Sequence, residues 1–459
     1  MQIKVRPVLI VGREGGFTTQ VMPWHVYPQT NGQLEVTTDA ETSRSRIESL
    51  HREVMGKLKS DVVFLDPALV QEEGDLIALR KDTCEADAFL VYLPGSISHG
   101  ALETLFWDLP IPIIVFSGEY TPMMGLYYLP VEEREYHPNV TFALDLGEIE
   151  YQIRLLGVKK RLRNSKMVLL GSHQRETFFW QFLPEPEITR RKLGVEFIPL
   201  SSAQFVAEVG QIEEAKAEAI AQQWMAGAKE VAEPSPDEVK EAAAMYLAIG
   251  AVLKRTGAQA VSAGCLELMY AFNRRPFCFA LAMLRDEGLP AGCEADATAT
   301  LTMLILDYIA NRPAYMGNLV RVEPKENLLM ISHGCSPSKV AGRDQPAKPY
   351  TLVRSHSYPP FTRVIDGGAG LTSYVDYDIG QEVTITRLGA NLDRMPAAKG
   401  EIVDCRDTIC DRTTITVRVK DAREFFHQAT GNHQVVVYGD YIRELRGLCQ
   451  LLGINFFEI

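Results

Sequence analysis

Two carboxylates and two histidines stand where their side chains could bind a cation and move a proton. Glu294 and Asp296 lie in GCEADATATLTMLIL, where small residues lead into an apolar helical pattern. His333 ends the apolar segment NLLMISH, and His433 follows a Gly-Asn pair in TGNHQVVVYGD. Carboxylate and imidazole groups from distant segments suit a hard divalent ion such as Mn²⁺ or Mg²⁺ better than zinc. Carboxylates also act as general acids and bases.

The same residues have structural interpretations, which the sequence leaves open. Acids in the first turn of a helix cap its free amides and favour its dipole. A single histidine at a strand end often packs in a core. Ligands of open α/β sheets bind beyond the carboxyl ends of the strands, however, and Glu294 and Asp296 come after such a strand end. Small neighbours, among them Gly292 and Ala295, would leave room for a ligand there.

Strand and helix patterns alternate through the first two thirds of the chain. Apolar runs such as VRPVLIVG, AFLVYLPG and IPIIVFSG indicate strands buried on both faces, and SRIESLHREVMGKL and 99–107 read as helices. The turn REGG has no G-x-G-x-x-G, so it does not indicate a dinucleotide site. A second α/β unit begins at SKMVLLGSH, and its two long helices are separated by EVAEPSPDE, with a new N-cap at the serine. The alternation predicts two α/β units with doubly wound parallel sheets, at 1–164 and 165–315.

The last part of the chain, 316–459, has a different pattern. Short strand-like segments such as YTLVRSHSY, QEVTITRLG and TTITVRVK follow one another, separated by Gly, Asp and Pro. This spacing is typical of an antiparallel barrel or sandwich. A final helix is expected at DYIRELRGLCQLLG.

Composition excludes several classes of function. The chain of 459 residues has a formal charge of −12, whereas nucleic acids and anionic membranes need a basic surface. No apolar run is long enough to span a bilayer, and the first residues lack a signal-peptide pattern. The eight cysteines are scattered without a C-x-x-C pair, which argues against a structural zinc site. We therefore expect a cytoplasmic protein that binds neither nucleic acid nor membrane.

The segments GCEADATATLTMLIL, NLLMISHGCSP and TGNHQVVVYGD resemble the L-fucose and L-arabinose isomerase family. The resemblance implies two Rossmann-like domains followed by a C-terminal barrel, and a trimer or hexamer with active sites at subunit contacts. It also implies a Mn²⁺-dependent aldose–ketose isomerase, although another divalent metal could serve. By this resemblance Glu294 is a metal ligand and acid/base, and His433 and His333 are metal ligands.

One position departs from the family pattern. The second catalytic carboxylate is expected within MGNLV (316–320), which offers only Asn318. An amide oxygen can ligate a metal but an amide cannot take a proton. Asn318 is therefore a predicted ligand, and Asp296, Glu267 or His333 is left to supply the second proton-transfer group.

The predicted function is interconversion of an aldose and a ketose through a cis-enediol, with a small sugar as substrate and Glu294 and Asp296 as catalytic candidates. Two alternatives stay open because of Asn318: a related metal-dependent sugar enzyme (an epimerase or a retro-aldol enzyme), or a sugar-binding homologue without catalysis. Asp296 can also orient the metal shell or cap the helix. Candidates for holding sugar hydroxyls are Glu267, Arg387, Asn391 and Asp393.

Overall fold

The computed structural model describes residues 2–10, 40–58, 62–71, 73–92, 111–116, 140–172, 182–272, 277–355, 369–408 and 411–459. The chain divides into two compact units, Met1–Lys160 and Arg161–Ile459. The REGG turn and the helix expected at 99–107 lie outside the described residues. The predicted α/β class is confirmed, whereas the three domains at 1–164, 165–315 and 316–459 stay a prediction.

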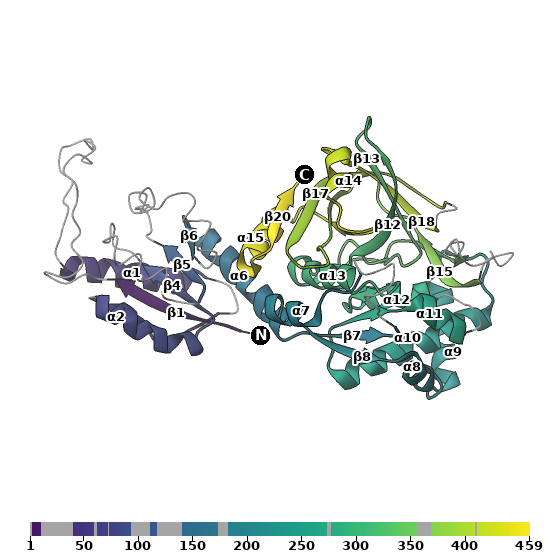
Figure 1. Ribbon diagram of the computed structural model, residues 1–459, viewed down its shortest axis with the longest axis horizontal. Coiled ribbons are helices and arrows are strands. Elements are labelled where there is room, and N and C mark those ends of the chain that lie inside the picture. The colour runs from purple at the N-terminus through teal and green to yellow at the C-terminus, as the bar shows by residue number, and fades with distance from the viewer. Residues whose placement is uncertain are drawn as a thin grey trace. The chain divides into compact units, whose positions relative to one another are not determined.

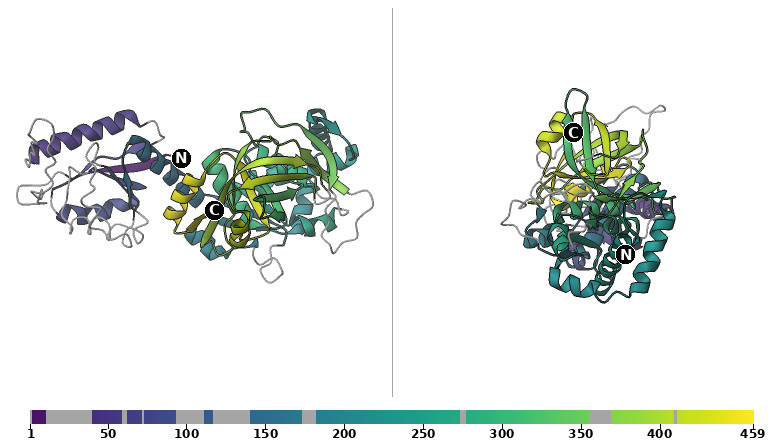
Figure 2. Two further views of the ribbon diagram at one scale, coloured as in Figure 1. Left: turned by 90° about the horizontal axis from the view of Figure 1, so that it is seen from above. Right: turned by 90° about the vertical axis from the view of Figure 1, so that its right-hand side faces the viewer.

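The first unit is built on a parallel sheet in the order β2-β1-β4-β5-β6, with β3 also pairing with β1. Its strands are β1 Ile3–Ile10, β2 Val62–Phe64, β3 Ala68–Val70, β4 Ala88–Tyr92, β5 Ile113–Phe116 and β6 Val140–Ala143. Every residue of β4 and β5 is buried, as the apolar runs predicted. The helices are α1 Ala40–Lys57, α2 Glu73–Ala78, η2 Leu79–Cys84 and α6 Leu146–Arg163, which continues into the second unit. In the left view of Figure 2, α1 and α2 lie on opposite sides of β1.

A second parallel sheet, in the order β11-β10-β7-β8, opens the second unit. Its strands are β7 Lys166–Leu170, β8 Glu196–Leu200, β10 Ala260–Ala263 and β11 Ala291–Gly292. The helices are α7 Pro186–Lys192, α8 Ser202–Val209, α9 Glu214–Gly227, α10 Pro236–Thr256, α11 Cys265–Ala271, α12 Cys278–Asp286 and α13 Ala297–Ala310. The predicted break between the two long helices is confirmed: Ser235 caps α10 with a capping box completed by Glu238.

Six strands of the same unit form a closed barrel in the order β16-β19-β12-β13-β18-β17, because β16 also pairs with β17. These strands are β12 Tyr315–Glu323, β13 Leu328–His333, β16 Glu382–Thr386, β17 Arg394–Arg406, β18 Thr413–Val419 and β19 His433–Tyr438, and β20 Asn455–Glu458 adds to β17. A smaller sheet holds β9 Glu230–Val231, β14 Tyr350–Ser355 and β15 Ala369–Val375, and α14 Ala422–Gln428 and α15 Ile442–Leu452 complete the chain. The barrel alternative of the sequence analysis is therefore confirmed. Closure leaves no exposed strand edge in the ring.

Helix α13 lies between the parallel sheet and the barrel, where it contacts β10, β11 and β19 (Figure 1). Twelve of its fourteen residues are buried, which explains why its pattern is apolar on all sides. The loop that precedes α13 is consequently held against both sheets. This placement brings residues of the loop next to strand ends of the barrel.

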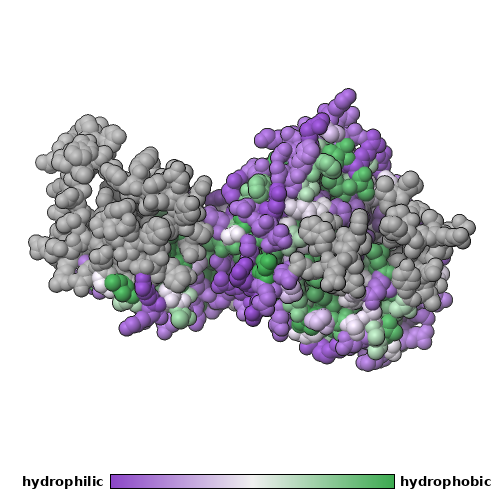
Figure 3. Space-filling model, viewed as in Figure 1, coloured by the Kyte–Doolittle hydropathy of each residue, from purple (hydrophilic) through white to green (hydrophobic). Residues whose placement is uncertain are grey.

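The surface shown in Figure 3 is mainly hydrophilic, and its apolar residues form separate patches among polar ones. Large exposed apolar side chains such as Ile379 and Phe426 are scattered singly over the described residues. Among the described helices, none combines the length and the apolar character that a membrane span needs. The predicted homo-oligomer stays a prediction.

Candidate functional site

The loop between β11 and α13 has a strained backbone conformation at two consecutive residues. Glu294 and Ala295 have φ angles of 55° and 57°, in the left-handed region that non-glycine residues rarely occupy. Such residues cost about 1–3 kcal/mol each, and they cluster where a side chain must be aimed at a functional site. Hydrogen bonds from Ala295 N to Ala263 O (2.8 Å) and from Asp296 N to Cys293 O (3.1 Å) hold the turn. Only glycine fits at Gly292, because a Cβ there would lie 1.8 Å from Thr300 Oγ1.

The turn aims Glu294 at two histidines of the barrel. Glu294 Oε1 lies 3.7 Å from His333 Nε2, and its Oε2 lies 3.4 Å from His433 Nε2. Both histidines are buried, whereas the Glu294 side chain keeps 25% of its surface exposed. Each Nε2 is buried without a hydrogen-bond partner. Two unsatisfied imidazole nitrogens that face one carboxylate form the arrangement expected around a cation.

His433 is held by a fully buried ion pair behind it. Its Nδ1 lies 2.8 Å from Asp296 Oδ2, and Arg387 donates to both Asp296 oxygens, at 2.6 and 3.1 Å. Asp296 Oδ1 also accepts from Ala299 N (2.8 Å) and so caps α13. Because a carboxylate only accepts hydrogen bonds, Nδ1 of His433 donates, and the lone pair of the neutral ring lies on Nε2. Asp296 therefore fixes both the orientation and the tautomer of His433.

The acidic and basic side chains of the site stabilise one another's charged forms. Burial favours the neutral form of Glu294, but His433 and His333 hold its pKa below the usual value. Burial likewise opposes charge on His433, yet its hydrogen bond to Asp296 and the nearby negative charges of Glu294 and Asp296 raise its pKa. For Asp296, burial is outweighed by Arg387 and His433, which lower the pKa. Both acids are thus ionised at neutral pH.

His333 has a different partner behind it, Cys335. The backbone N of Cys335 lies 3.3 Å from His333 Nδ1. Burial opposes charge on His333, but the negative charge of Cys335 and a hydrogen bond to it raise the pKa of His333 to about 9. The backbone N–H of Cys335 can only donate, so Nδ1 of His333 is an acceptor here, and ligation of a metal through Nε2 would require the ring proton to lie on Nδ1 instead.

The raised pKa of His333 predicts a pH effect on the metal-free protein. A histidine with a pKa of 6.5 in the unfolded chain and about 9 in the folded one adds stability that is complete below pH 6.5 and lost as pH rises through 9. We expect the melting temperature of chelator-treated protein to fall over this range, and less so in His333→Gln. Thermal unfolding from pH 6 to 10 measures this, with exposed His427→Gln as control; identical pH profiles of wild type and His333→Gln would contradict it.

The structure brings Glu294, His333 and His433 together, with their ligand atoms within 4.8 Å of one another. Asn318 pairs with His433 across β12 and β19, but its Oδ1 accepts from Asn432 Nδ2 (2.6 Å). Its role as a ligand stays a prediction. Arg387, expected to hold sugar hydroxyls, is fully buried and bonded to Asp296, so it presents no accessible donor.

The other predicted substrate residues have different surroundings from Glu294, His333 and His433. Glu267 is exposed in the first turn of α11, where it accepts hydrogen bonds from Ser172 N (2.6 Å) and Ser202 Oγ. Asn391 and Asp393 are exposed in the turn between β16 and β17. No contact joins these side chains to Glu294, His333 or His433 in the described part of the chain. Their substrate roles stay predictions.

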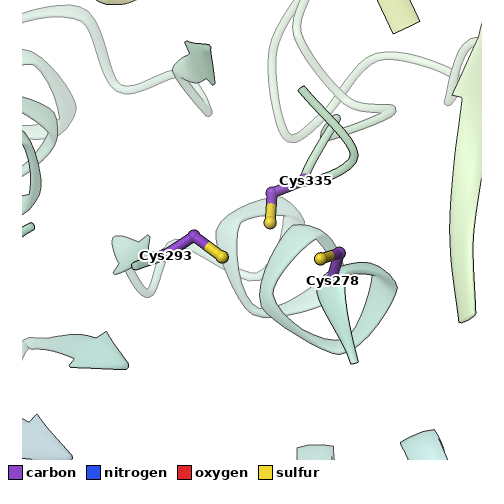
Figure 4. A group of neighbouring side chains, drawn as sticks. All are labelled: Cys278, Cys293 and Cys335. Carbon is purple, nitrogen blue, oxygen red and sulfur yellow. The ribbon is translucent and has the colours of Figure 1, made fainter. Parts of the chain in front are cut away.

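The sequence analysis missed a group of buried cysteines beside the site. The sulfurs of Cys278, Cys293 and Cys335 lie within 4.8 Å of one another, and Figure 4 shows them pointing toward a common centre. The argument from C-x-x-C spacing considers only cysteines close in sequence. One signal was available: Cys293 directly precedes Glu294, and Cys335 follows His333 by two residues.

Comparisons with known proteins point to sugar isomerases over part of the chain. No family model matches it. A sulfoquinovose isomerase from Clostridium sp. (strain MSTE9) is 25% identical over 219 residues, which is 46% of this chain and 46% of that protein. Sulfoquinovose isomerases from Priestia aryabhattai and Priestia megaterium are 25% identical over 186 residues, or 39% of each chain. The similarity thus spans less than half the length of these relatives.

Among solved structures, a solute-binding protein of an ABC transporter from Burkholderia multivorans aligns with 68% of this chain and 95% of its own. Its identity is 11% and its TM-score is 0.18, too low to support a shared fold. The similarity to sulfoquinovose isomerases is therefore the informative comparison. It agrees in reaction class with the resemblance in the sequence motifs, while membership in the fucose and arabinose isomerase family stays a prediction.

Proposed function

We propose that this protein is a metal-dependent sugar isomerase that interconverts an aldose and a ketose through a cis-enediol. The observation that carries the proposal is the pair of buried, unbonded Nε2 atoms of His333 and His433 facing the Glu294 carboxylate. The partial similarity to sulfoquinovose isomerases supports a sugar as the substrate class.

The three side chains fit a divalent ion. Two imidazoles and one carboxylate suit a borderline or hard ion such as Mn²⁺, and they leave coordination positions for a substrate. The groups behind these side chains fit as well. The other ring nitrogen of His433 donates a hydrogen bond to the Asp296 carboxylate, which Arg387 holds in place. When bound, the ion would polarise the sugar carbonyl and stabilise the negative charge that develops on the enediol oxygens.

Glu294 is the proton carrier in this proposal. Its lowered pKa keeps it in the basic form, and it is the one side chain of the three that is partly exposed, at 25%, which favours it as the group that meets a sugar. In a cis-enediol, carbons 1 and 2 can both be reached by a carboxylate that lies on one side of the enediol plane. One carboxylate can therefore take the proton from carbon 2 and return it to carbon 1, while the hydroxyl proton of O2 passes to the neighbouring O1 and the carbonyl moves from carbon 1 to carbon 2. Asp296 positions His433, and its burial keeps it away from the sugar.

The test is an assay of the full chain with and without Mn²⁺ on a panel of aldoses that includes sulfoquinovose, fucose, arabinose and glucose. In D₂O the products are followed by NMR. Mn²⁺-dependent ketose formation, with deuterium at carbon 1 of the ketose and, after the reverse reaction, at carbon 2 of the aldose, supports the proposal. An inverted aldose would indicate epimerisation and shorter fragments retro-aldol cleavage. No turnover on any sugar despite Mn²⁺ binding would overturn it.

Asn318 favours one alternative, a sugar-binding protein without catalysis. Its amide cannot move a proton, and its oxygen already accepts a hydrogen bond from Asn432. Sugar binding that is independent of metal, measured by calorimetry on chelator-treated protein, would support this alternative. Size-exclusion chromatography with light scattering tests the predicted trimer or hexamer in the same preparation.

Replacing Asn318 with Asp restores the carboxylate of the resembling family. Asp keeps the acceptor for Asn432 and adds a negative charge near His433, so we expect Mn²⁺ to bind about 10-fold more tightly and isomerase activity to be kept or raised. Calorimetric titration and initial rates measure the two effects. Tighter Mn²⁺ binding with loss of activity on every sugar would show that the native chemistry needs a neutral group at this position.

A further inference from the structure

We propose that Cys278, Cys293 and Cys335 form a second metal site, which binds a thiophilic d¹⁰ cation, Zn²⁺ or Cu⁺. This site is separate from the Glu294 site, and its existence does not depend on the isomerase proposal. The three sulfurs come from the start of α12, the loop after β11 and the loop after β13. In Figure 4 all three point inward to one position.

The geometry fits a metal–thiolate centre. At the usual metal–sulfur distance of about 2.3 Å, sulfurs bound to one ion lie roughly 3.8–4.0 Å apart. The three sulfurs lie within 4.8 Å of one another, so at most a small contraction brings them to this spacing, and all three cysteines are free and buried. A donor set made only of thiolates selects soft ions over Mn²⁺ or Mg²⁺. The two neighbouring sites would therefore take different metals.

Buried cysteines can also serve only as small apolar side chains of a core. The surroundings of Arg285 favour a metal site over that interpretation. Its guanidinium is 2% exposed and donates to the carbonyl oxygens of Ala291 (2.8 Å) and Cys335. Among the described residues no carboxylate forms an ion pair with it. A buried cation without a counter-charge is costly. Three thiolates around Zn²⁺ carry one negative charge, and around Cu⁺ two, which would supply the missing anion beside Cys335.

Cys265 distinguishes the two ions. Its sulfur lies 3.1 Å from that of Cys293 but outside the group whose sulfurs all lie within 4.8 Å of one another, so it would become a fourth ligand only by moving toward Cys278 and Cys335. Structural Zn²⁺ is almost always four-coordinate, whereas three thiolates suffice for Cu⁺. Cys265→Ser should therefore weaken Zn²⁺ binding and leave Cu⁺ binding unchanged.

The experiment uses reduced, metal-free full-length protein titrated anaerobically with Zn²⁺ or Cu⁺ against a chromophoric chelator. We expect one equivalent to bind, and Cys278→Ala to weaken it by more than ~10²-fold, beyond the 10–100-fold typical of outer-shell changes. Cys449→Ala, a buried cysteine outside the cluster, is the matched control and should bind like the wild type. Glu294→Gln should also keep this ion, while Cys278→Ala should keep Mn²⁺.

Two results would overturn the site. One is wild-type protein that binds neither ion more tightly than Cys278→Ala. The other is an ion lost in Glu294→Gln but retained in Cys278→Ala, since it would then belong to the histidine site. If Cys278→Ala fails to fold, X-ray absorption of the wild type with one equivalent of Zn²⁺ or Cu⁺ decides. Three or four sulfurs at about 2.3 Å support the site, and a shell of only nitrogen and oxygen refutes it.

Discussion

Glu294→Gln is expected to lower the isomerase turnover number by at least ~10²-fold, the usual scale for loss of a general base. Glutamine keeps the size of the side chain and one oxygen that can face a cation. It cannot accept a proton from carbon 2 of a sugar. The loss should therefore appear in kcat rather than in sugar binding.

The reason lies in the position of this carboxylate. It is the only partly exposed member of a group whose two histidines are buried, and the strained turn at Glu294 and Ala295 directs it toward them. Glu326→Gln makes the same chemical change on an exposed turn between β12 and β13 and is the control. Steady-state rates and circular dichroism of both variants are compared with the wild type. If Glu294→Gln is folded, binds Mn²⁺ and turns over at the wild-type rate, Glu294 is not the base.

Asp296→Ala is expected to have the largest effect on stability. It leaves the Arg387 guanidinium, which is fully buried, without its counter-charge. Removing one partner of a buried ion pair typically costs about 3–5 kcal/mol of unfolding free energy, and loss of the helix cap adds about 1 kcal/mol. His433 also loses the group that orients it, so Mn²⁺ affinity should fall 10–100-fold.

Denaturant unfolding and calorimetric titration measure the two losses. Glu213→Ala breaks an exposed pair with Lys216 and should change stability little. Arg387→Met combined with Asp296→Ala should recover part of the stability, because it removes the unpaired charge. Asp296→Asn should reduce activity less than Glu294→Gln does. A loss of kcat in Asp296→Asn as large as in Glu294→Gln, with metal binding unchanged, would instead make Asp296 catalytic.

Much of the fold could be predicted because its signals are local. Apolar runs predicted the parallel strands, since residues buried on both faces need no alternation. Ser235 indicated the start of α10 because serine is a preferred N-cap residue, and it caps that helix in the structure. The short strands after residue 316 predicted a barrel or sandwich, and closure into a barrel required the pairing of β16 with β17, which no local pattern encodes.

The three side chains of the candidate site could be predicted from the sequence, but the contacts that hold them in place could not. Glu294, His333 and His433 were found because each stands at a strand end or before a helix. The pairing of Arg387 with Asp296 spans 91 residues and depends on how the barrel meets α13. The cysteine cluster likewise depends on the start of α12 and two loops that are distant in sequence. Asn318 lies within β12, and the direction of its side chain depends on how β12 pairs with β13 and β19, which no local sequence pattern shows.

The most direct test of the central claim is pulsed electron paramagnetic resonance of Mn²⁺ bound to the full chain, with ¹⁵N-labelled histidine. We expect couplings to two histidine nitrogens, of which one disappears in His333→Gln and the other in His433→Gln. His427→Gln should leave both unchanged. Mn²⁺ bound without histidine nitrogen, or with couplings that neither variant removes, would contradict a metal centre at Glu294, His333 and His433.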